Sequence, residues 1–288
     1  MSTPVRFEHI LSESRNGVAH VTLNRPERLN PLGNGPGSMR DEISRALAEA
    51  EADDKVGAIL ISAAGRCFSA GADLSGTMPN ESALHAHLFG EQILRFYAGI
   101  RALHKPVIAA VHGLCIGAAL GMIAQCDLVI AADDARFGLV EGRIGYPGAA
   151  ELVPLVGAMW AKYLIFTGEL IDAERAERIG LVLGVEPRGE LLERAFSLAE
   201  RIARMPRDAL MLNKASVEAV WEAMGRSLAR IAGRPHENLT IAMSRQAQAP
   251  DGRRFDDILK NEGVEGMKRA RDAQFSGTWL RRTPREGR

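Results

Sequence analysis

Two short stretches of small residues have the composition of sites that bind an oxygen through backbone amides. The first, 117–119, precedes apolar residues at helical spacing, so its N–H groups lie in a first helical turn, at the positive end of the helix dipole. The second contains Gly71, whose backbone freedom would turn the N–H of Ala72 outward. Two such amides from separate loops can form an oxyanion hole, which stabilises negative charge on a reacting carbonyl oxygen.

The elements expected around these stretches alternate strands with helices. Short apolar runs predict buried strands, and Asn16-Gly17 predicts a hairpin turn, which together give strands at 5–13, 18–23, 56–62, 106–111, 128–132, 135–138 and 181–185. Apolar periodicity predicts helices over 39–53, with Ser38 as its cap, and over 84–104, 151–166 and 172–178. From residue 190 the chain is almost wholly helical. We therefore expect an α/β core with the candidate site over 1–200 and a helical C-terminal region, fit for oligomerisation, over 201–288.

Composition excludes several classes of function. The 288 residues include 36 basic and 36 acidic side chains, so no global field favours nucleic acid or a membrane surface. The run 109–127 is as long as a membrane span, but His112, Gln125 and its glycines argue against one. The N-terminus lacks a signal peptide, and the three cysteines lie in apolar settings without zinc-site spacing. These features predict a cytoplasmic protein with reduced thiols, no metal site and no redox cofactor.

Six phrases along the chain resemble one family. They are NRPERLNPL at 24–32, GRCFSAGADL at 65–74, KPVIAAVHGLCIGAALGMIAQCD at 105–127, IAADDARFGLVE at 130–141, TGELIDAERAERIGLV at 167–182 and EGVEGMKRARDAQF at 262–275. The sequence is similar to the enoyl-CoA hydratase/isomerase (crotonase) superfamily. The resemblance implies a crotonase-like (ClpP/crotonase) spiral of ββα units with a helical C-terminal region. It also implies homotrimers or dimers of trimers.

The resemblance assigns roles to several residues near the two loops. Ala72 and Ala118 would supply the N–H groups that hold the thioester oxygen of an acyl-CoA, with CoA as part of the substrate and not a cofactor. The family usually has glycine at the position of Ala118. Arg28 and Arg66 lie where family members place basic residues near the CoA phosphates, although both could be solvated surface arginines. The remaining residues of the predicted CoA-binding segment are Ala70, Asp73 and Leu74. Asp73 and Asp127 belong to family phrases, and we expect both to be structural.

The acid–base groups determine the expected chemistry. Hydratases of this family use two glutamates, and the first is replaced here by Gly121, whereas the second aligns with Glu141. One carboxylate fits a proton shuttle that moves a double bond, with hydration weakened by about 10²–10⁴. The exchange to Gly121 is also expected to enlarge the acyl pocket. The polar residues left open as substitutes for the missing carboxylate are His85, His87 and Tyr146, with Glu151 as a reserve carboxylate.

Three other functions remain open at this point. On the same scaffold, water could attack the carbonyl, which would make the protein an acyl-CoA thioester or β-diketone hydrolase. Loss of the first glutamate could instead leave a non-catalytic acyl-CoA-binding scaffold. Nucleic-acid binding is disfavoured, because the charge is balanced and no basic, aromatic-rich face is visible in the sequence.

Overall fold

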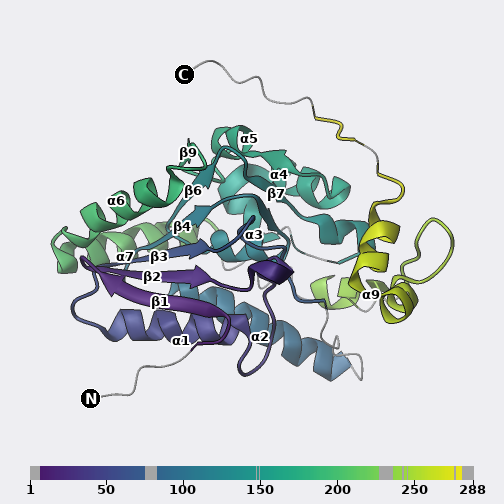
Figure 1. Ribbon diagram of the computed structural model, residues 1–288, viewed down its shortest axis with the longest axis horizontal. Helices are drawn as coiled ribbons and strands as arrows, with labels where there is room; N and C mark the ends of the chain where they lie inside the picture. The colour runs from purple at the N-terminus through teal and green to yellow at the C-terminus, as the bar shows by residue number, and fades with distance from the viewer. Residues whose placement is uncertain are drawn as a thin grey trace.

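A six-stranded sheet lies at the centre of the molecule (Figure 1). The computed structural model describes residues 7–74, 83–146, 148, 150–226, 236–241, 243–244, 246–275 and 277–280. The strands, in spatial order, are β1 (Ile10–Arg15), β2 (Val18–Leu23), β3 (Ala58–Ala63), β4 (Val107–Val111), β6 (Leu128–Ala132) and β9 (Gly184–Glu186). The hairpin pairs β1 with β2 in antiparallel fashion, as predicted, and all later neighbours are parallel. Their apolar runs fit strands that are covered on both faces.

A second, three-stranded sheet carries the loops of the candidate site. It consists of β5 (Leu114–Ile116), β7 (Arg136–Gly138) and β8 (Ile171–Asp172). β5 and β7 are parallel, whereas β7 and β8 are antiparallel. The sequence predicted β7 but not β5.

Helices cover both faces of the large sheet. α1 (Met39–Ala52) packs against β1, β2 and α2 (Ala83–Arg101), and the apolar side chains between these elements form the main core. α6 (Leu191–Ala203) covers the opposite face with Leu191, Ala195, Phe196 and Ala199. The Ser38 side chain accepts a hydrogen bond from the N–H of Asp41, which confirms the predicted N-cap of α1.

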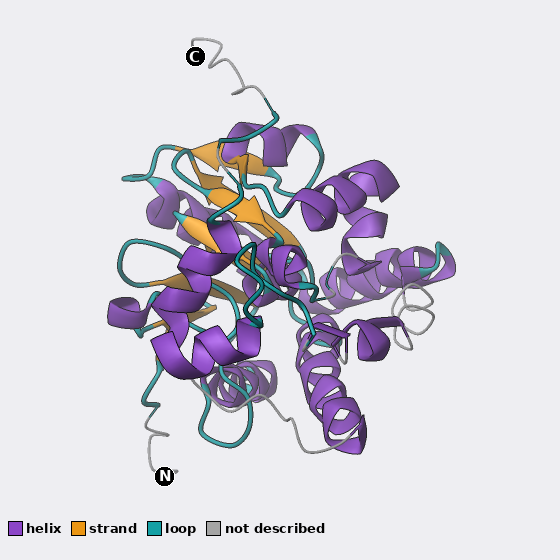
Figure 2. Ribbon diagram, turned by 90° about the vertical axis from the view of Figure 1, so that its right-hand side faces the viewer, coloured by secondary structure: helices purple, strands orange, loops and turns teal. Residues whose placement is uncertain are grey.

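The remaining helices surround the strands when the molecule is seen from its side (Figure 2). Among them are α3 (Ala118–Ile123), α4 (Val153–Thr167), α5 (Ala173–Arg178), α7 (Arg207–Ala223) and α9 (Phe255–Asp272), with 3₁₀ turns at η1 (Pro26–Arg28), η2 (Val140–Ile144) and η3 (Ala150–Leu152). The predicted boundary near residue 200 falls inside α6, and it stays a prediction. The run 109–127 is divided among β4, β5 and α3, so it forms no membrane span. All three cysteines are buried and unpaired.

One helical segment of the described chain, Ala150–Thr167, is long and apolar enough to cross a membrane by length and composition alone. Its mean hydropathy is 1.2, and 22% of its residues are buried. Val156, Ala161 and Leu164 face the core, whereas Met159 and Phe166 are exposed. The helix therefore packs a narrow inner face on the core and presents an apolar outer face.

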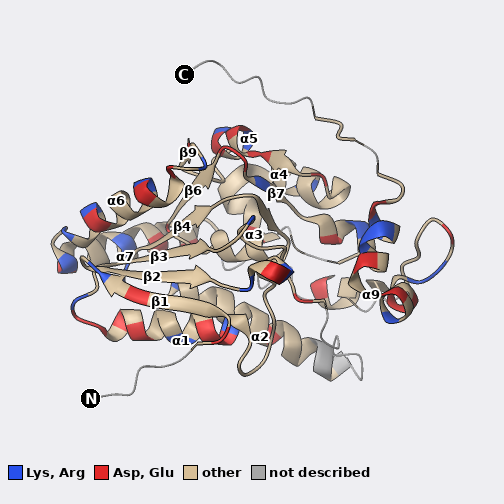
Figure 3. Ribbon diagram, viewed as in Figure 1, with Lys and Arg blue, Asp and Glu red and all other residues tan. Residues whose placement is uncertain are grey.

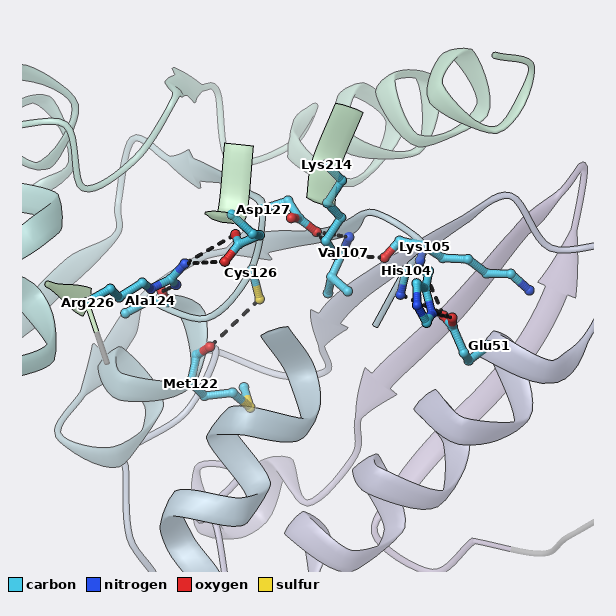
Figure 4. Close-up of polar contacts among 11 residues, drawn as sticks. Glu51, His104, Lys105, Val107, Met122, Ala124, Cys126, Asp127, Lys214 and Arg226 are labelled. Atoms are coloured by element: carbon cyan, nitrogen blue, oxygen red, sulfur yellow. Dashed lines mark hydrogen bonds and ion pairs between the residues drawn. The ribbon is translucent and has the colours of Figure 1, made fainter. Parts of the chain in front are cut away.

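Polar contacts from α7 and the residues just after it fix the far end of α3 (Figure 4). The Lys214 ammonium donates to Asp127 Oδ2 at 2.8 Å, and the same oxygen accepts from the N–H of Val107 at 2.7 Å. The buried Arg226 guanidinium donates to the carbonyl of Ala124 at 3.0 Å. Asp127 thus connects β4 to the C-terminal helices, in agreement with the predicted structural role.

Charge is distributed over the outside of the molecule without separation of sign. Figure 3 shows both acidic and basic residues along α6 and along α9. Such interspersed charges screen one another and create no extended positive field. The structure thus adds no support for a nucleic-acid-binding face within its described residues.

Candidate active site

Asn30 joins the loops that lead to the candidate site. Its side chain is fully buried, and its Nδ2 donates to the carbonyls of Ala64 and Cys67 at 2.9 and 3.1 Å. Its Oδ1 accepts from the N–H of Arg25 at 2.7 Å, and its own carbonyl accepts from Ser69 Oγ at 2.6 Å. These four bonds hold the turn around η1 against the loop that contains Gly71.

The loop at Gly71 lies directly against the start of α3. Ser69 forms an isolated parallel bridge with β5, donating to the carbonyl of Leu114 and accepting from the N–H of Ile116. Gly71 has φ of +92°, and a Cβ added to it would lie 2.7 Å from the carbonyl oxygen of Ile116 and 3.4 Å from the nitrogen of Ala118. Only glycine allows this approach, so the glycine predicted to turn the loop also brings it to α3.

The two predicted amides are available at this junction. Ala72 is exposed and Ala118 is half-buried, and neither N–H donates to a protein acceptor within the described residues. Ala118 is the first residue of α3, after Gly117 with φ of +56°, and its own φ is not positive. Alanine therefore fits where the resembled family has glycine. Both N–H groups are therefore left for a ligand oxygen where the Gly71 loop meets α3.

Glu141 lies beside the same helix start. It follows β7 in the turn η2, and a Cβ added to Gly117 would lie 3.1 Å from its Oε2. A Cβ added to Gly148 would lie 2.9 Å from its Oε1. The carboxylate is therefore enclosed by two glycines, and the altered loop after Glu141 leaves it next to α3.

The surroundings of Glu141 favour the protonated form. Its Oε2 is buried and has no hydrogen-bond partner within the described part of the chain. Burial raises the pKa of Glu141 to about 7, although a backbone hydrogen bond and the charge of Arg271 oppose the shift. A carboxylate with this pKa can accept and return a proton near neutral pH, as a general acid–base group must.

The structure corrects the expectation that Gly121 enlarges the pocket. A Cβ added to Gly121 would lie 2.9 Å from Tyr97 Oη and 3.0 Å from its Cζ. Tyr97 comes from α2, is 8% exposed, and donates from Oη to the carbonyl of Ala118 at 2.9 Å. Sequence reasoning missed this residue, because a tyrosine on a long helix carries no local sign of its partner.

The side chains considered as substitutes for the missing carboxylate lie elsewhere where they are described. His87 is exposed, and Tyr146 packs against the cluster that contains Phe255. The side chain of His85 lies outside the described residues. Glu151 Oε2 accepts from Gln125 Nε2 at 2.7 Å, so this carboxylate is engaged beside α3.

The residues predicted to bind CoA are divided between surface and interior. Arg28 and Arg66 are exposed on touching turns, since a Cβ added to Gly65 would lie 2.5 Å from Cβ of Pro26. Asp73 forms a half-buried ion pair with Arg25 at 3.4 Å, which supports a structural role. Of the other two, Ala70 donates to a carbonyl of the η1 turn and Leu74 packs on the cluster near η2.

A serine–histidine–glutamate contact occurs on the opposite side of the large sheet. His20 Nε2 lies 2.8 Å from Ser62 Oγ, and its Nδ1 lies 3.5 Å from Glu13 Oε1. Burial lowers the pKa of His20, and Phe196 of α6 packs edge-on against its ring. Ser62 is 5% exposed beneath this helix. The group is therefore a buried polar contact and offers no open nucleophile.

Comparison with known proteins gives the same family as the motifs. The family model described as enoyl-CoA hydratase/isomerase matches residues 13–248. A probable enoyl-CoA hydratase of Mycobacterium leprae is 35% identical over 223 residues, which are 76% of this chain and 84% of the relative. A short-chain-enoyl-CoA hydratase of Clostridium acetobutylicum is 35% identical over 218 residues, covering 74% and 82%.

Solved structures agree with these sequence matches. The crystal structure of an enoyl-CoA hydratase/isomerase from Xanthobacter autotrophicus superposes with a TM-score of 0.86 at 31% identity, covering 94% of this chain and all of that one. The fold is the crotonase fold with a helical C-terminal region. The protein belongs to the enoyl-CoA hydratase/isomerase family.

Proposed function

We propose that this protein is an enoyl-CoA isomerase in which Glu141 is the single acid–base residue. The observation that carries the proposal is the carboxylate of Glu141 beside Gly117, together with the Tyr97 phenol that lies against Gly121, where the first glutamate of the family is missing. The related proteins named above are hydratases and a hydratase/isomerase, which supports an acyl-CoA thioester as the substrate class.

The proposed reaction moves one proton and one double bond. The N–H groups of Ala72 and Ala118 bind the thioester oxygen of a 3-enoyl-CoA. Glu141 removes a proton from C2, and the electron pair forms a dienolate whose negative oxygen is stabilised by the two amides. The protonated Glu141 then returns the proton to C4, which leaves a 2-enoyl-CoA of unchanged mass. No water is consumed.

Recognition of CoA is assigned to the surface next to the oxyanion hole. The exposed guanidinium groups of Arg28 and Arg66 would pair with phosphate oxygens, for which the planar arginine fork is well suited. Ala70 and Leu74 would border the pantetheine portion through the backbone and an apolar side chain. Asp73 would act indirectly, by fixing the loop through Arg25.

The deciding experiment compares wild type with Glu141→Gln on separate 2-enoyl-CoA and 3-enoyl-CoA substrates. We expect Glu141→Gln to lower the isomerisation rate by about 10²–10⁴ while CoA binding changes little, because glutamine keeps the shape but cannot shuttle a proton. The products are followed by chromatography and mass spectrometry, and binding by calorimetry. Glu193→Gln, an exposed glutamate of α6, is the matched control and should retain full activity.

Each other product would identify a different function. Gain of one water on the 2-enoyl-CoA, faster than isomerisation of the 3-enoyl-CoA, would make the protein a hydratase. Release of free CoA would indicate the hydrolase. Tight binding of both compounds without a product, unchanged in Glu141→Gln, would indicate a non-catalytic scaffold.

We infer further that the protein assembles with copies of itself, as a trimer or a dimer of trimers in the cytoplasm. α7 exposes apolar side chains that a monomer would leave in water: Leu212, Val217 and Val220. The outer face of α4 adds Met159 and Phe166. Light scattering of purified protein should therefore give a mass of three or six chains, and a stable monomer would refute the assembly.

A further inference from the structure

The missing carboxylate position is filled by Tyr97 of α2. The hypothetical Cβ at Gly121 would lie 2.9 Å from Tyr97 Oη, closer than carbon and oxygen can pack without a shift. Tyr97 and the adjacent Phe96 are both buried, so both side chains lie on the side of α2 that packs on the core. Any side chain at position 121 and the tyrosine at position 97 compete for the same space.

The phenol also contacts the oxyanion-hole residue itself. Its Oη donates to the carbonyl of Ala118 at 2.9 Å, and the N–H of that same alanine is one of the two proposed donors to the thioester oxygen. Since α3 has only six residues, its own hydrogen bonds hold this first turn weakly. The bond from Tyr97 therefore adds an outside support to the turn.

Tyr97 cannot serve as a base in this position. Burial raises the pKa of Tyr97 to about 12; the charge of Arg40 opposes this shift, and the charges of Glu151 and Glu141 add to it. The phenol is neutral at working pH, and its only proton is committed to the carbonyl of Ala118. Its contribution is thus shape and position rather than proton transfer.

We propose that Tyr97 and Gly121 form a specificity-determining pair: the phenol positions Ala118 and occupies the volume in which a second carboxylate would hold water. The proposal rests on the one-base isomerisation argued above and explains how the chain restricts itself to it. Hydration adds hydroxyl at C3 and a proton at C2, so it needs a group that takes a proton from water. With Tyr97 in place, that group and its water have no room.

The first test removes only the hydroxyl. Tyr97→Phe should lower kcat for the 3-enoyl-CoA about 2–10-fold, the effect of one lost hydrogen bond, while KM stays within about 2-fold. Hydration of a 2-enoyl-CoA should stay at the wild-type level, because the ring still fills the site. Tyr163→Phe on α4, which removes a hydroxyl bonded to Glu169, is the matched control and should leave kcat unchanged.

The second test exchanges the pair. Tyr97→Ala/Gly121→Glu should raise hydration of a 2-enoyl-CoA at least about 10-fold over wild type, whereas Gly121→Glu alone should not, because Tyr97 blocks the new carboxylate. If the double variant does not fold, a double-mutant cycle with smaller substitutions at positions 97 and 121 replaces it. Gly121→Ala should lower kcat in wild type and do so several-fold less in a Tyr97→Leu background, since only the tyrosine clashes with the added methyl. Folding is checked by circular dichroism.

The outcomes separate this inference from the proposed function. If wild type does not isomerise a 3-enoyl-CoA, or Glu141→Gln keeps full activity, the proposed function fails. If wild type isomerises but Tyr97→Phe behaves like Tyr163→Phe, the positioning role is refuted. If the exchanged pair folds without gaining hydration, or Gly121→Ala costs the same in both backgrounds, the competition for space is refuted.

Discussion

Glu141 combines a buried position with a proposed role that needs its charge. The carboxylate lies between the backbones of Gly117 and Gly148, and its Oε2 has no hydrogen-bond partner within the described residues. Arg271 offsets the burial only in part. An ionised Glu141 therefore destabilises the folded state locally. The same burial gives the residue a pKa suited to the proposed proton transfer.

The pH dependence of the free energy of unfolding should reflect the raised pKa of Glu141. Because its folded pKa is about 7 and its ordinary value 4.5, the folded state binds more protons between these values than the unfolded state. The contribution of Glu141 to the free energy of unfolding therefore falls as pH rises through this window, by up to about 3 kcal/mol. Glu141→Gln does not titrate, so its Tm should exceed that of wild type at about pH 8 and match it at about pH 5.

Thermal melts across this range give the measurement. Glu193→Gln, on the exposed face of α6, should show no such crossover. A difference between Glu141→Gln and wild type that stays constant with pH would contradict the raised pKa. A kcat/KM that does not decline below about pH 7 would contradict it by a second route.

At the scale of elements, the site depends on a short helix held from outside at both ends. α3 receives the Gly71 loop and the Tyr97 hydroxyl at its start. Arg226 donates to the carbonyl of Ala124 at its end. Six residues cannot sustain a helix alone, so tertiary contacts set the direction of its first N–H groups.

Gly71→Ala should separate the two amides. Its Cβ would lie 2.7 Å from the carbonyl oxygen of Ile116, so the loop must move away from α3, and loss of one oxyanion donor lowers kcat about 10²–10³. Gly252→Ala is the control, because Gly252 also has a positive φ, +84°, but no atom lies within 4 Å of the added Cβ. Steady-state kinetics on a 3-enoyl-CoA would measure both. Equal losses in the two variants would mean that backbone strain alone, not displacement of the loop, causes the effect.

At the scale of the whole molecule, an ion pair connects the C-terminal helices to the central strands. Asp127 accepts from Lys214 and from the N–H of Val107, which links α7 to the start of β4. The aromatic residue Phe196 adds apolar contact from α6 on the same side of the sheet. The C-terminal region is therefore part of what stabilises the core.

Removing the Lys214 cation alone should lower the free energy of unfolding more than removing both members of its ion pair with Asp127. Lys214→Met leaves Asp127 partly buried without its cation, and we expect the free energy of unfolding to fall by about 2–3 kcal/mol. Lys214→Met/Asp127→Asn should recover part of that loss. Urea unfolding measures both, with exposed Lys260→Met on α9 as the control. A double variant less stable than the single one would show that Asp127 acts through Val107 rather than through Lys214.

Local patterns predicted most of the architecture. The cap at Ser38, the turn at Asn16-Gly17 and the apolar run of β6 each act within a few residues, so their signals are complete in the sequence. The phrases around Gly71 and Glu141 likewise predicted which segments meet. The two loops and the carboxylate are adjacent in the structure.

The occupant of the missing carboxylate position could not be predicted in the same way. Tyr97 and Gly121 lie on different helices, and their contact depends on how α2 packs on α3. The absence of a side chain at 121 therefore indicated space where the structure has a phenol. Glu151 was equally ambiguous, because only the fold shows that it bonds to Gln125.

The interlocked Tyr97 and Gly121 have an evolutionary consequence. If glutamate appears at position 121 first, its side chain clashes with the phenol of Tyr97. If the tyrosine is lost first, a cavity remains beside α3. On the proposed roles, each single step would damage the enzyme, so isomerisation and hydration would be separated by a fitness valley that two coordinated substitutions must cross. Ancestral reconstruction along this branch would be expected to find positions 97 and 121 changing together.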